Sequence, residues 1–523
     1  MAVRKLPPDY ENKTRQKLKD EDCPKSLLVI FNFAFTPMIQ DLMKELDSKF
    51  DGIRGNKAYP RVLLLIVVLY CFSKNINKYD SMSEECKHND CLKIILDNKK
   101  PSRGTFTNFM NNSDTEVTHK IFISTLVLLN DLKAFSIIKV FIDGTDIIVR
   151  ASRNYWLKQK DLDVMYQLFE WNLLHDGSKQ GIEKSLEGLN IKLKEYEDDE
   201  DMVKLIESAK RRIKIHKHKV FAKRKRYEKI FEKRGDVKLS IIFPEAVYMK
   251  TKRGRFDFAF NLQEVMTKNH VVFLGILLSQ PNDGKAIPDI FNQMKKTLNI
   301  FLEMQTKYGE RDNVGQFERE FAKIILIADA GYFTVYNLYF IFINKINALI
   351  KPTSESREDN NNLRKKSGNS KKEIKSIRKY FTRVKGGYKC NQGRFLGFNK
   401  SIKIKHHKPH KDDNLPDICK DERQIYSRNS CRGCEYEEIC PKKIEDRKSF
   451  LIRWMTDRFL DKRRNFNYNP RAAISEGINA FHKSDDGHLK FVGTTLNAVK
   501  TECDFRNAVY NLTRIETLKE EGL

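Results

Sequence analysis

The chain has 523 residues, more than one hydrophobic core usually supports, so two or three domains are expected. Its 97 Lys and Arg residues outnumber its 70 Asp and Glu residues, which gives a formal net charge of +27. This excess favours a phosphate-bearing partner, nucleic acid above all, over a neutral small metabolite. A generally lysine-rich proteome is the alternative explanation of the charge.

Membrane and export signals are not visible in the sequence. The strongest apolar run, RVLLLIVVLYCF, is about half as long as a membrane span, and the first residues contain no apolar signal segment. We therefore expect a cytoplasmic protein with no membrane partner. In that compartment the ten cysteines are expected to be reduced thiols rather than a disulfide framework.

Residues 1–135 are predicted to form an all-helical N-terminal domain. Apolar residues recur there at helical spacing, as in SLLVIFNFAF, MIQDLMKEL and RVLLLIVVLY, and Gly, Pro and Asn turn signals separate these runs. The polar and basic faces of such helices either contact DNA or are merely solvated.

Residues 136–523 are predicted to form an α/β domain. The first strand is expected in IIKVFIDGTDIIV, which reads as buried on both faces. Further strands are expected in RFDFAFNLQEV, HVVFLGILLSQ, AKIILIAD and NALIKP, with an amphipathic helix in AIPDIFNQMKKTLNIFLEM. Strands joined by a helical crossover predict a mixed sheet flanked by helices.

Two segments interrupt this α/β domain. Residues 155–235 are rich in Lys and Glu and predict a helical hairpin or a short coiled coil. Residues 352–450 begin with a Lys-, Ser-, Asn- and Gly-rich stretch that extends to about residue 400 and predicts a flexible linker. A Cys-bearing insertion follows it, and the chain then becomes helical again.

Two of the predicted strands end in an aspartate, and a later helix carries a glutamate. Asp143 follows VFI, Asp329 follows LIA, and Glu476 lies in a helix that Asn469 and Pro470 are expected to begin. Because a carboxylate leaving a buried strand needs a cation, the three predict a magnesium site. The alternatives are a turn in DGTD, a helix N-cap at the second Asp, and a surface salt bridge for the Glu.

The residues around these carboxylates resemble bacterial insertion-sequence transposases of the DDE type, in the branch with the YREK signature. FIDGTD and IADAGYF resemble the DGT and ADxGY phrases of that family, and FNLQ resembles its YNxQ strand. The N-terminal stretch YPRVLLLIVVLY is similar to the helical domain that precedes the catalytic core there, so the resemblance covers most of the chain. The signature residues in this chain are Tyr468, Arg471, Glu476 and Lys483.

The resemblance implies an RNase H-like catalytic core and a DNA transposase that acts on double-stranded DNA near the nucleoid. Asp143, Asp329 and Glu476 are then the catalytic residues, and they hold two Mg²⁺ or Mn²⁺ ions about 4 Å apart. The enzyme would cut at the ends of an insertion sequence by hydrolysis and join them to target DNA by transesterification, as a homodimer in the DNA complex. The alternatives are a stand-alone metal-dependent nuclease and an inactive relic that only binds DNA.

Four further residues are expected to contact DNA. Arg471 and Lys483 would neutralise phosphates, and Tyr468 would donate to a phosphate or stack on a base. Trp454 would stack on an extruded base, unless it is an ordinary core residue.

The sequence departs from the family pattern at two places. Asp146 follows the DGT phrase and is a rival to Asp143 as the metal ligand, although strand alternation would direct it to the opposite face. Four residues separate Arg471 from Glu476, one more than in the strict signature.

Cys390, Cys431, Cys434 and Cys440 form a second candidate metal site, for a structural zinc ion. The spacing CRGCEYEEIC supplies one CxxC pair and a third Cys close by. Cys419 competes as the fourth ligand, and reduced thiols without metal are the alternative for the whole group.

Overall fold

The structure is a computed structural model that describes residues 6–48, 59–149, 151, 156–175, 178–212, 223–251, 254–309, 314–353, 381–390, 392–403, 416–420, 422–427, 429–434, 445–463, 465, 468, 471–482, 491–493 and 495–521. Helices and mixed strands make it an α/β fold, as predicted. No single described helix combines the length and apolar character of a membrane span, although α2 (Lys25–Ala34) and α3 (Pro37–Ser48), bent by 65°, meet that test as a pair.

The N-terminal region is helical, as the apolar spacing predicts. Its central helix, α4, is buried on all sides from Val62 to Phe72, because every face of RVLLLIVVLYCFS is apolar. The helices of this region are α1 (Tyr10–Asp20), α2, α3, α4 (Arg61–Ser73), α5 (Tyr79–His88), α6 (Asp90–Leu96), α7 (Arg103–Asn112) and α8 (Thr115–Asp131).

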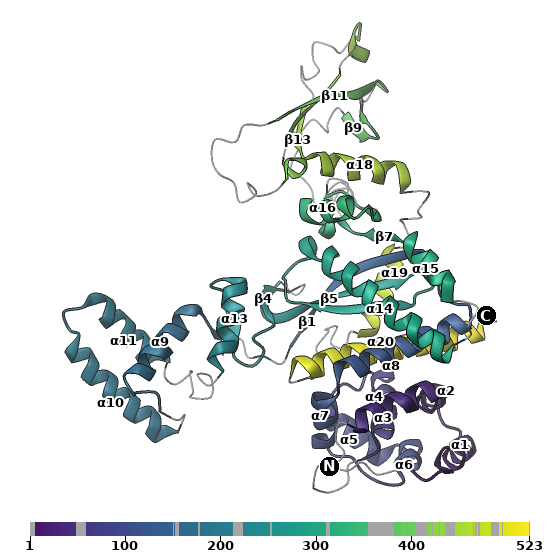
Figure 1. Ribbon diagram of the computed structural model, residues 1–523, viewed down its shortest axis with the longest axis vertical. Helices are drawn as coiled ribbons and strands as arrows, with labels where there is room; N and C mark the ends of the chain where they lie inside the picture. The colour runs from purple at the N-terminus through teal and green to yellow at the C-terminus, as the bar shows by residue number, and fades with distance from the viewer. Residues whose placement is uncertain are drawn as a thin grey trace, which may run out of the picture.

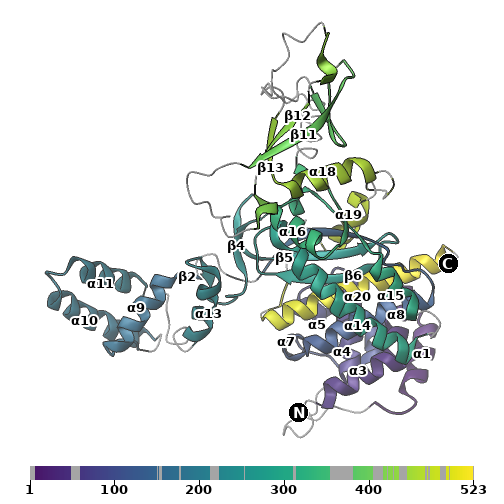
Figure 2. The ribbon, with the colours of Figure 1, turned by 45° about the horizontal axis from the view of Figure 1, so that its top comes forward.

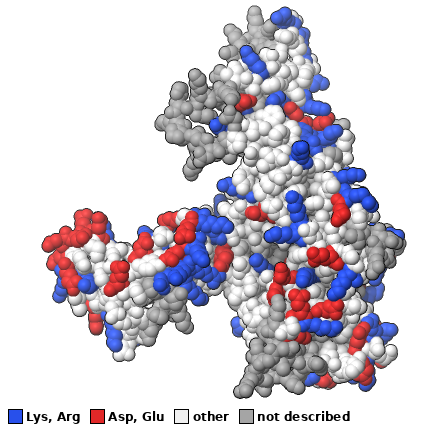
Figure 3. Space-filling model, viewed as in Figure 1, with Lys and Arg blue, Asp and Glu red and all other residues white. Residues whose placement is uncertain are grey.

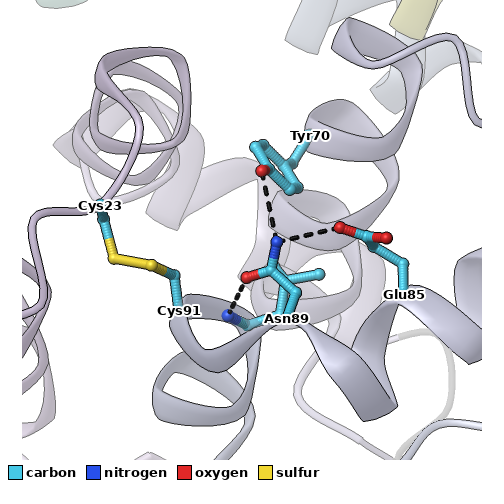
Figure 4. Close-up of a disulfide and its surroundings, with 6 residues drawn as sticks. Cys23, Tyr70, Glu85, Asn89 and Cys91 are labelled. Carbon is cyan, nitrogen blue, oxygen red and sulfur yellow. Dashed lines mark hydrogen bonds between the residues drawn. A yellow bond between two sulfur atoms is a disulfide. The ribbon is translucent and has the colours of Figure 1, made fainter.

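A disulfide joins two of these helical segments. Cys23, just after α1, is bonded to Cys91 in α6 (Figure 4), so the prediction that all cysteines are reduced is wrong for this pair. The two residues are 68 positions apart and meet because α1 packs against α6. Beside the bond, Asn89 caps α6 by accepting a hydrogen bond from Leu92 N at 3.1 Å and donates to Glu85 at 2.9 Å.

Replacing Cys23 by Ser should lower the free energy of unfolding by about 2–4 kcal/mol under oxidising conditions, because the bond closes a long loop in the unfolded chain. Chemical denaturation with and without a thiol reductant measures the effect. The difference between wild type and variant should disappear in reductant. Equal stability of the two proteins without reductant would show that this bond does not form.

The central sheet has six strands, in the order β4-β5-β1-β7-β8 with β6 beside β5. β1 runs parallel to β7, and β7 runs parallel to β8; β5 is antiparallel to β1, β4 and β6. The expected strands all form, so the mixed sheet predicted from the apolar runs is confirmed. The strands are β1 (Lys139–Ile148), β4 (Val247–Lys250), β5 (Phe256–Thr267), β6 (Val272–Leu278), β7 (Ile325–Ala328) and β8 (Asn347–Ile350).

The N-terminal helices and the sheet share one hydrophobic core. A single cluster of buried side chains extends from Leu18 in α1, through Val140 in β1, to Leu518 near the C-terminus. The last helix, α20 (Leu496–Glu520), causes this continuity, because it contacts α4, α7 and α8 as well as β6 and lies between the two regions (Figure 1). The packing therefore runs without a break across the predicted boundary at residue 135.

The described residues between 156 and 240 form an arm that extends from the sheet edge (Figure 1), and its helical hairpin is formed by α10 and α11, as predicted. The arm has hydrophobic clusters of its own, which include Leu168, Leu189 and Ile206. Its elements are β2 (Trp156–Leu157), α9 (Gln159–Glu170), α10 (Lys179–Glu195), α11 (Glu200–Arg212), α13 (Arg224–Arg234) and β3 (Leu239–Ser240).

A second sheet of five antiparallel strands lies beyond helix α18 (Phe450–Lys462), at the opposite end of the molecule from the N-terminal helices (Figures 1 and 2). Its first strands occupy residues 381–403, so the prediction of a flexible linker as far as residue 400 is wrong there; residues 354–380 lie outside the described part. A small core of Phe381, Tyr388, Leu396 and Tyr426 holds the sheet together. The strands are β9 (Phe381–Val384), β10 (Gly387–Cys390), β11 (Phe395–Lys403), β12 (Glu422–Tyr426) and β13 (Glu445–Lys448).

The remaining helices lie in the chain after the strand β6. These are η1 (Asp283–Lys285), α14 (Ile287–Tyr308), α15 (Val314–Ala322), η3 (Ala330–Tyr332), α16 (Val335–Ile343), η5 (Asp417–Cys419), η6 (Asn429–Cys431), α18 (Phe450–Lys462) and α19 (Arg471–His482). α14 is the amphipathic crossover helix that the sequence predicts between β6 and β7.

Candidate active site

Asp143 lies in the middle of β1, not at its end as predicted. β1 continues to Ile148 because its second half pairs with β5, where Asp143 stands opposite Glu264. Its parallel partner β7 ends sooner, with Ala328 beside Ile142. The DGTD segment is therefore strand, which rules out the turn alternative, and Asp143 is the first residue beyond the parallel pairing.

Asp329 follows β7 immediately, level with Asp143 on the neighbouring strand. Its Oδ1 accepts a hydrogen bond from Gly331 N at 2.8 Å and caps the short helix η3. The N-cap alternative is therefore confirmed, but it uses one carboxylate oxygen only. The other oxygen, Oδ2, lies 3.8 Å from an Arg471 guanidinium nitrogen.

Arg471 bridges the two aspartates from the first turn of α19. Its Nη1 lies 3.4 Å from Asp143 Oδ1, while Nη2 faces Asp329. Asn479, two turns later on the same helix, donates from Nδ2 to Asp143 Oδ2 at 3.1 Å. The side chain of Arg471 is 14% exposed and that of Asp143 is 19% exposed, so this cation and carboxylate are largely shielded from water.

Burial and charge pull the pKa values of this group in opposite directions. Burial raises the pKa of Asp329, helped by the Asp143 and Asp283 carboxylates, and Arg471 together with the Gly331 amide only partly offsets it. For Arg471, burial lowers the pKa, but the two aspartates outweigh burial and leave the pKa raised. The two aspartates therefore keep the Arg471 guanidinium charged, whereas this single positive charge does not fully compensate the buried Asp329 carboxylate.

Glu476 is carried by the same helix but is not gathered with the two aspartates. It is exposed and makes no ion pair with any described residue, so the surface salt-bridge alternative has no support in that part of the chain. Helical geometry turns it about 60° from Asn479, which does reach Asp143. Within the described ranges no three His, Cys, Asp or Glu side chains lie close enough to hold a metal ion together.

The donor set at Asp143 and Asp329 nevertheless fits a divalent cation. Two carboxylates from neighbouring strands already share one cationic group. The Oδ1 atom of Asn479, whose Nδ2 bonds Asp143, is buried without a hydrogen-bond partner among the described residues, so this amide has one more oxygen that could bind a cation. Carboxylate and amide oxygens are the ligands that Mg²⁺ and Mn²⁺ prefer.

Tyr468, the first residue of the signature, lies beside the two aspartates. The Tyr468 hydroxyl donates to Ala328 O at 3.3 Å, and its ring meets Phe459 edge-on at 5.0 Å. Burial, partly offset by Arg471, raises the pKa of Tyr468 to about 12, so the hydroxyl is a neutral donor. Lys483, Asn469 and Pro470 lie outside the described residues.

Trp454 is half-buried on α18, against the main core. Its ring meets Phe342 edge-on at 5.4 Å. It also lines a cavity of about 310 Å³ together with Arg453 and Lys385, next to the second sheet. This position is compatible with both alternatives, the core residue and the base-stacking residue.

The cysteines of the second candidate site are divided between two parts of the fold. Cys431 is buried in the small core of the second sheet, and Cys390 packs against that core, whereas Cys419 belongs to the main core beside α18. Cys434 is half-buried close to Cys431, and Cys440 lies outside the described part. The described cysteines thus form no group of three that could bind zinc.

Sequence reasoning missed Asp283, which lies within electrostatic reach of Asp329 and beside Gly144, the residue after Asp143. Its carboxylate raises the pKa of Asp329 and accepts hydrogen bonds from Asn261 and Gln263. The segment SQPNDGK predicts only a turn. The one available signal was FNLQ, whose Asn and Gln both contact Asp283.

Asp329→Asn should make the protein more stable at pH 7.5 in metal-free buffer. The pKa of Asp329 is raised in the folded state, so its favourable contribution is complete below the unfolded value of 3.8 and is lost as pH rises through the folded pKa. An Asn imitates the protonated form and keeps an acceptor for Gly331 N. The excess stability should therefore shrink as pH falls toward 4, in denaturation curves recorded with EDTA. A variant less stable than wild type at pH 7.5 would mean that Arg471 outweighs burial.

No family model, no curated protein and no solved structure matches the chain.

Proposed function

We propose that the chain is a DNA transposase of the DDE type with an RNase H-like core, which cuts at the ends of a mobile element and joins them to target DNA. One observation carries the proposal: Asp143 and Asp329, on neighbouring parallel strands, share a cation from the helix that also bears Glu476. The strand arrangement supports it, since three antiparallel strands, β6, β5 and β1, continue into the parallel pair β7 and β8.

Each residue of the site has a role in this chemistry. Asp143 and Asp329 would hold a divalent cation. Glu476 is exposed on α19, the helix that also carries Arg471, and is available as a further ligand. When bound, such ions supply the positive charge that stabilises the attacking and leaving oxygens at phosphorus. Arg471 is placed to contact a phosphate when it leaves the aspartates, and Tyr468 fixes the end of β7 through Ala328 O.

The charge distribution supports a DNA partner. Lys and Arg gather where the arm meets the sheet, whereas Asp and Glu gather at the far tip of the arm (Figure 3). On α13, Lys225, Lys229 and Lys233 are exposed at a spacing of four residues and therefore follow one side of the helix. Such a row can follow a phosphate backbone without reading its sequence.

An end-joining assay tests the proposal. The protein is incubated with Mg²⁺, a supercoiled plasmid and labelled DNA fragments that carry the sequences flanking its gene. Covalently joined product supports the transposase. Cleavage without joining would identify a stand-alone nuclease, and a shifted band without any chemistry would identify a DNA-binding relic; either result overturns the proposal.

A further inference from the structure

We propose that Asp283 is a positioning residue of the site: a buried hydrogen-bond network centred on it fixes the spacing between the β1 segment of Asp143 and the turn of Asp329. Its meaning for catalysis rests on the proposed function. The network lies on the face of the sheet opposite α19, because Gly144 and Gln263, which stand opposite each other in β1 and β5, both face Asp283.

The network joins three separate segments, η1, β5 and η3, through hydrogen bonds. Asp283 Oδ1, in η1, accepts hydrogen bonds from Asn261 Nδ2 at 3.0 Å and from Gln263 Nε2 at 2.6 Å, both on β5. Gln263 Oε1 in turn accepts a hydrogen bond from the Tyr332 hydroxyl, at the end of η3. Since Asp329 caps the start of η3, the chain of contacts runs from Asp283 to the second candidate metal ligand.

Two glycines make room for this arrangement. A Cβ on Gly144 would lie 2.5 Å from both Asp283 Oδ1 and Gln263 Nε2, so a side chain on the residue after Asp143 would displace both groups from their hydrogen bond. A Cβ on Gly331 would lie 3.0 Å from Asp329 Oδ1 and 3.1 Å from Asp283 Oδ2. The glycines of the DGT and ADAGY phrases thus let Asp283 approach the backbone next to each candidate ligand.

Burial makes the hydrogen bonds of this network costly to break. Gln263 and Tyr332 are both 0% exposed. Burial raises the pKa of the Tyr332 hydroxyl well above its usual range, so it remains a hydrogen-bond donor. A buried polar group left without its partner costs about 1–3 kcal/mol, so these side chains tolerate only the arrangement that satisfies them all.

Hydrogen bonds also join the turns of Asp283 and Asp329 to α16 and α14. Asn337 Nδ2 donates to Asp283 O at 3.0 Å and to Tyr332 O at 3.1 Å, and Asn337 Oδ1 accepts from Ile287 N at 3.3 Å. Thr334 also donates to Gly284 O. The turns that contain Asp283 and Asp329 are therefore held as one body, which Asp283 and Tyr332 connect to β5.

The test compares Asp283→Ala with Asp283→Asn in the full chain. Asn keeps an acceptor oxygen for Asn261 and Gln263 but removes the charge, whereas Ala removes both. Two measurements are made: Mn²⁺ affinity by titration calorimetry, and hydrogen exchange of the peptide 325–334. We expect Ala to weaken Mn²⁺ binding about 10–100-fold and to speed exchange, and Asn to behave as the wild type.

Tyr332→Phe is the second variant, because it keeps the ring and removes only the bond to Gln263; it should act as Asp283→Ala does. Thr125→Val is the matched control, since it removes a buried hydroxyl contact to Asn511 far from the site and should change neither measurement. Equal losses in Asp283→Asn and Asp283→Ala would make Asp283 a direct ligand and overturn the positioning role. If wild type binds no Mn²⁺, the proposed function fails, and unchanged exchange in Asp283→Ala would overturn this inference separately.

Discussion

Asp143→Asn and Asp329→Asn should each reduce Mg²⁺-dependent strand cleavage and joining by at least about 10³-fold while DNA affinity stays near that of the wild type. Each substitution removes one negative charge from a pair that shares a single cationic group. Divalent ions contribute several kcal/mol to stabilising charge at phosphorus, and each 1.36 kcal/mol corresponds to a factor of ten in rate. Cleavage of a labelled fragment and a gel-shift titration measure the two quantities.

Asp146→Asn is the matched control for this pair. It is also a half-buried aspartate on β1, but it lies three residues further along and so faces the opposite side of the sheet. We expect it to retain most of the activity. Loss of cleavage in Asp146→Asn together with normal cleavage in Asp143→Asn would assign the ligand role to Asp146. An active Asp329→Asn protein would contradict a metal site formed by Asp143 and Asp329.

The central sheet could be predicted from the sequence because its strands are long apolar runs bounded by polar turns. Where β1 ends could not be predicted in the same way. Its last six residues, from Asp143 to Ile148, are held by β5 alone, and that pairing joins Ile148 to Ala259, more than a hundred residues away. The position of Asp143 inside the strand is thus a tertiary effect.

The second sheet was missed because its strands are short and its core is small. Averaged over residues 353–400, the composition is polar, although Phe381, Tyr388 and Leu396 are all buried. Part of its packing is between a cation and a ring, with the Arg383 guanidinium 5.2 Å from the Tyr388 ring centre. Composition counts such an arginine as solvated surface and therefore predicts a linker.

The candidate site was predicted in part. Residue type and strand position identified Asp143 and Asp329, because a carboxylate after an apolar strand requires an explanation. Nothing local distinguishes Asp283 from an ordinary turn aspartate, since its partners Asn261 and Gln263 lie about twenty residues earlier, on β5. The sequence also did not predict that α20 joins the N-terminal helices and the sheet in one core, because this depends on contacts between the two ends of the chain.

Arg471→Ala should have opposite effects on metal binding and on catalysis. The guanidinium lies where it competes with a divalent cation for Asp143 and Asp329, at 3.4 and 3.8 Å from their oxygens. Its removal should tighten Mn²⁺ binding about three- to tenfold, as expected for the loss of an ion pair of about 1 kcal/mol whose Asp329 side chain is 37% exposed. Strand cleavage should nevertheless fall about 10²–10³-fold, because a charged donor for the phosphate is lost.

This combination separates competition at the site from a general loss of structure. A destabilised protein would lose both metal affinity and activity. Removal of the competing guanidinium instead raises the metal affinity and lowers the activity. Arg458→Ala is the control, since that arginine is also partly buried but bonds Ala348 O on β8 rather than the aspartates, and its removal should leave Mn²⁺ affinity unchanged. Weaker Mn²⁺ binding in Arg471→Ala would show that the arginine organises the two carboxylates for the metal instead of occupying its place.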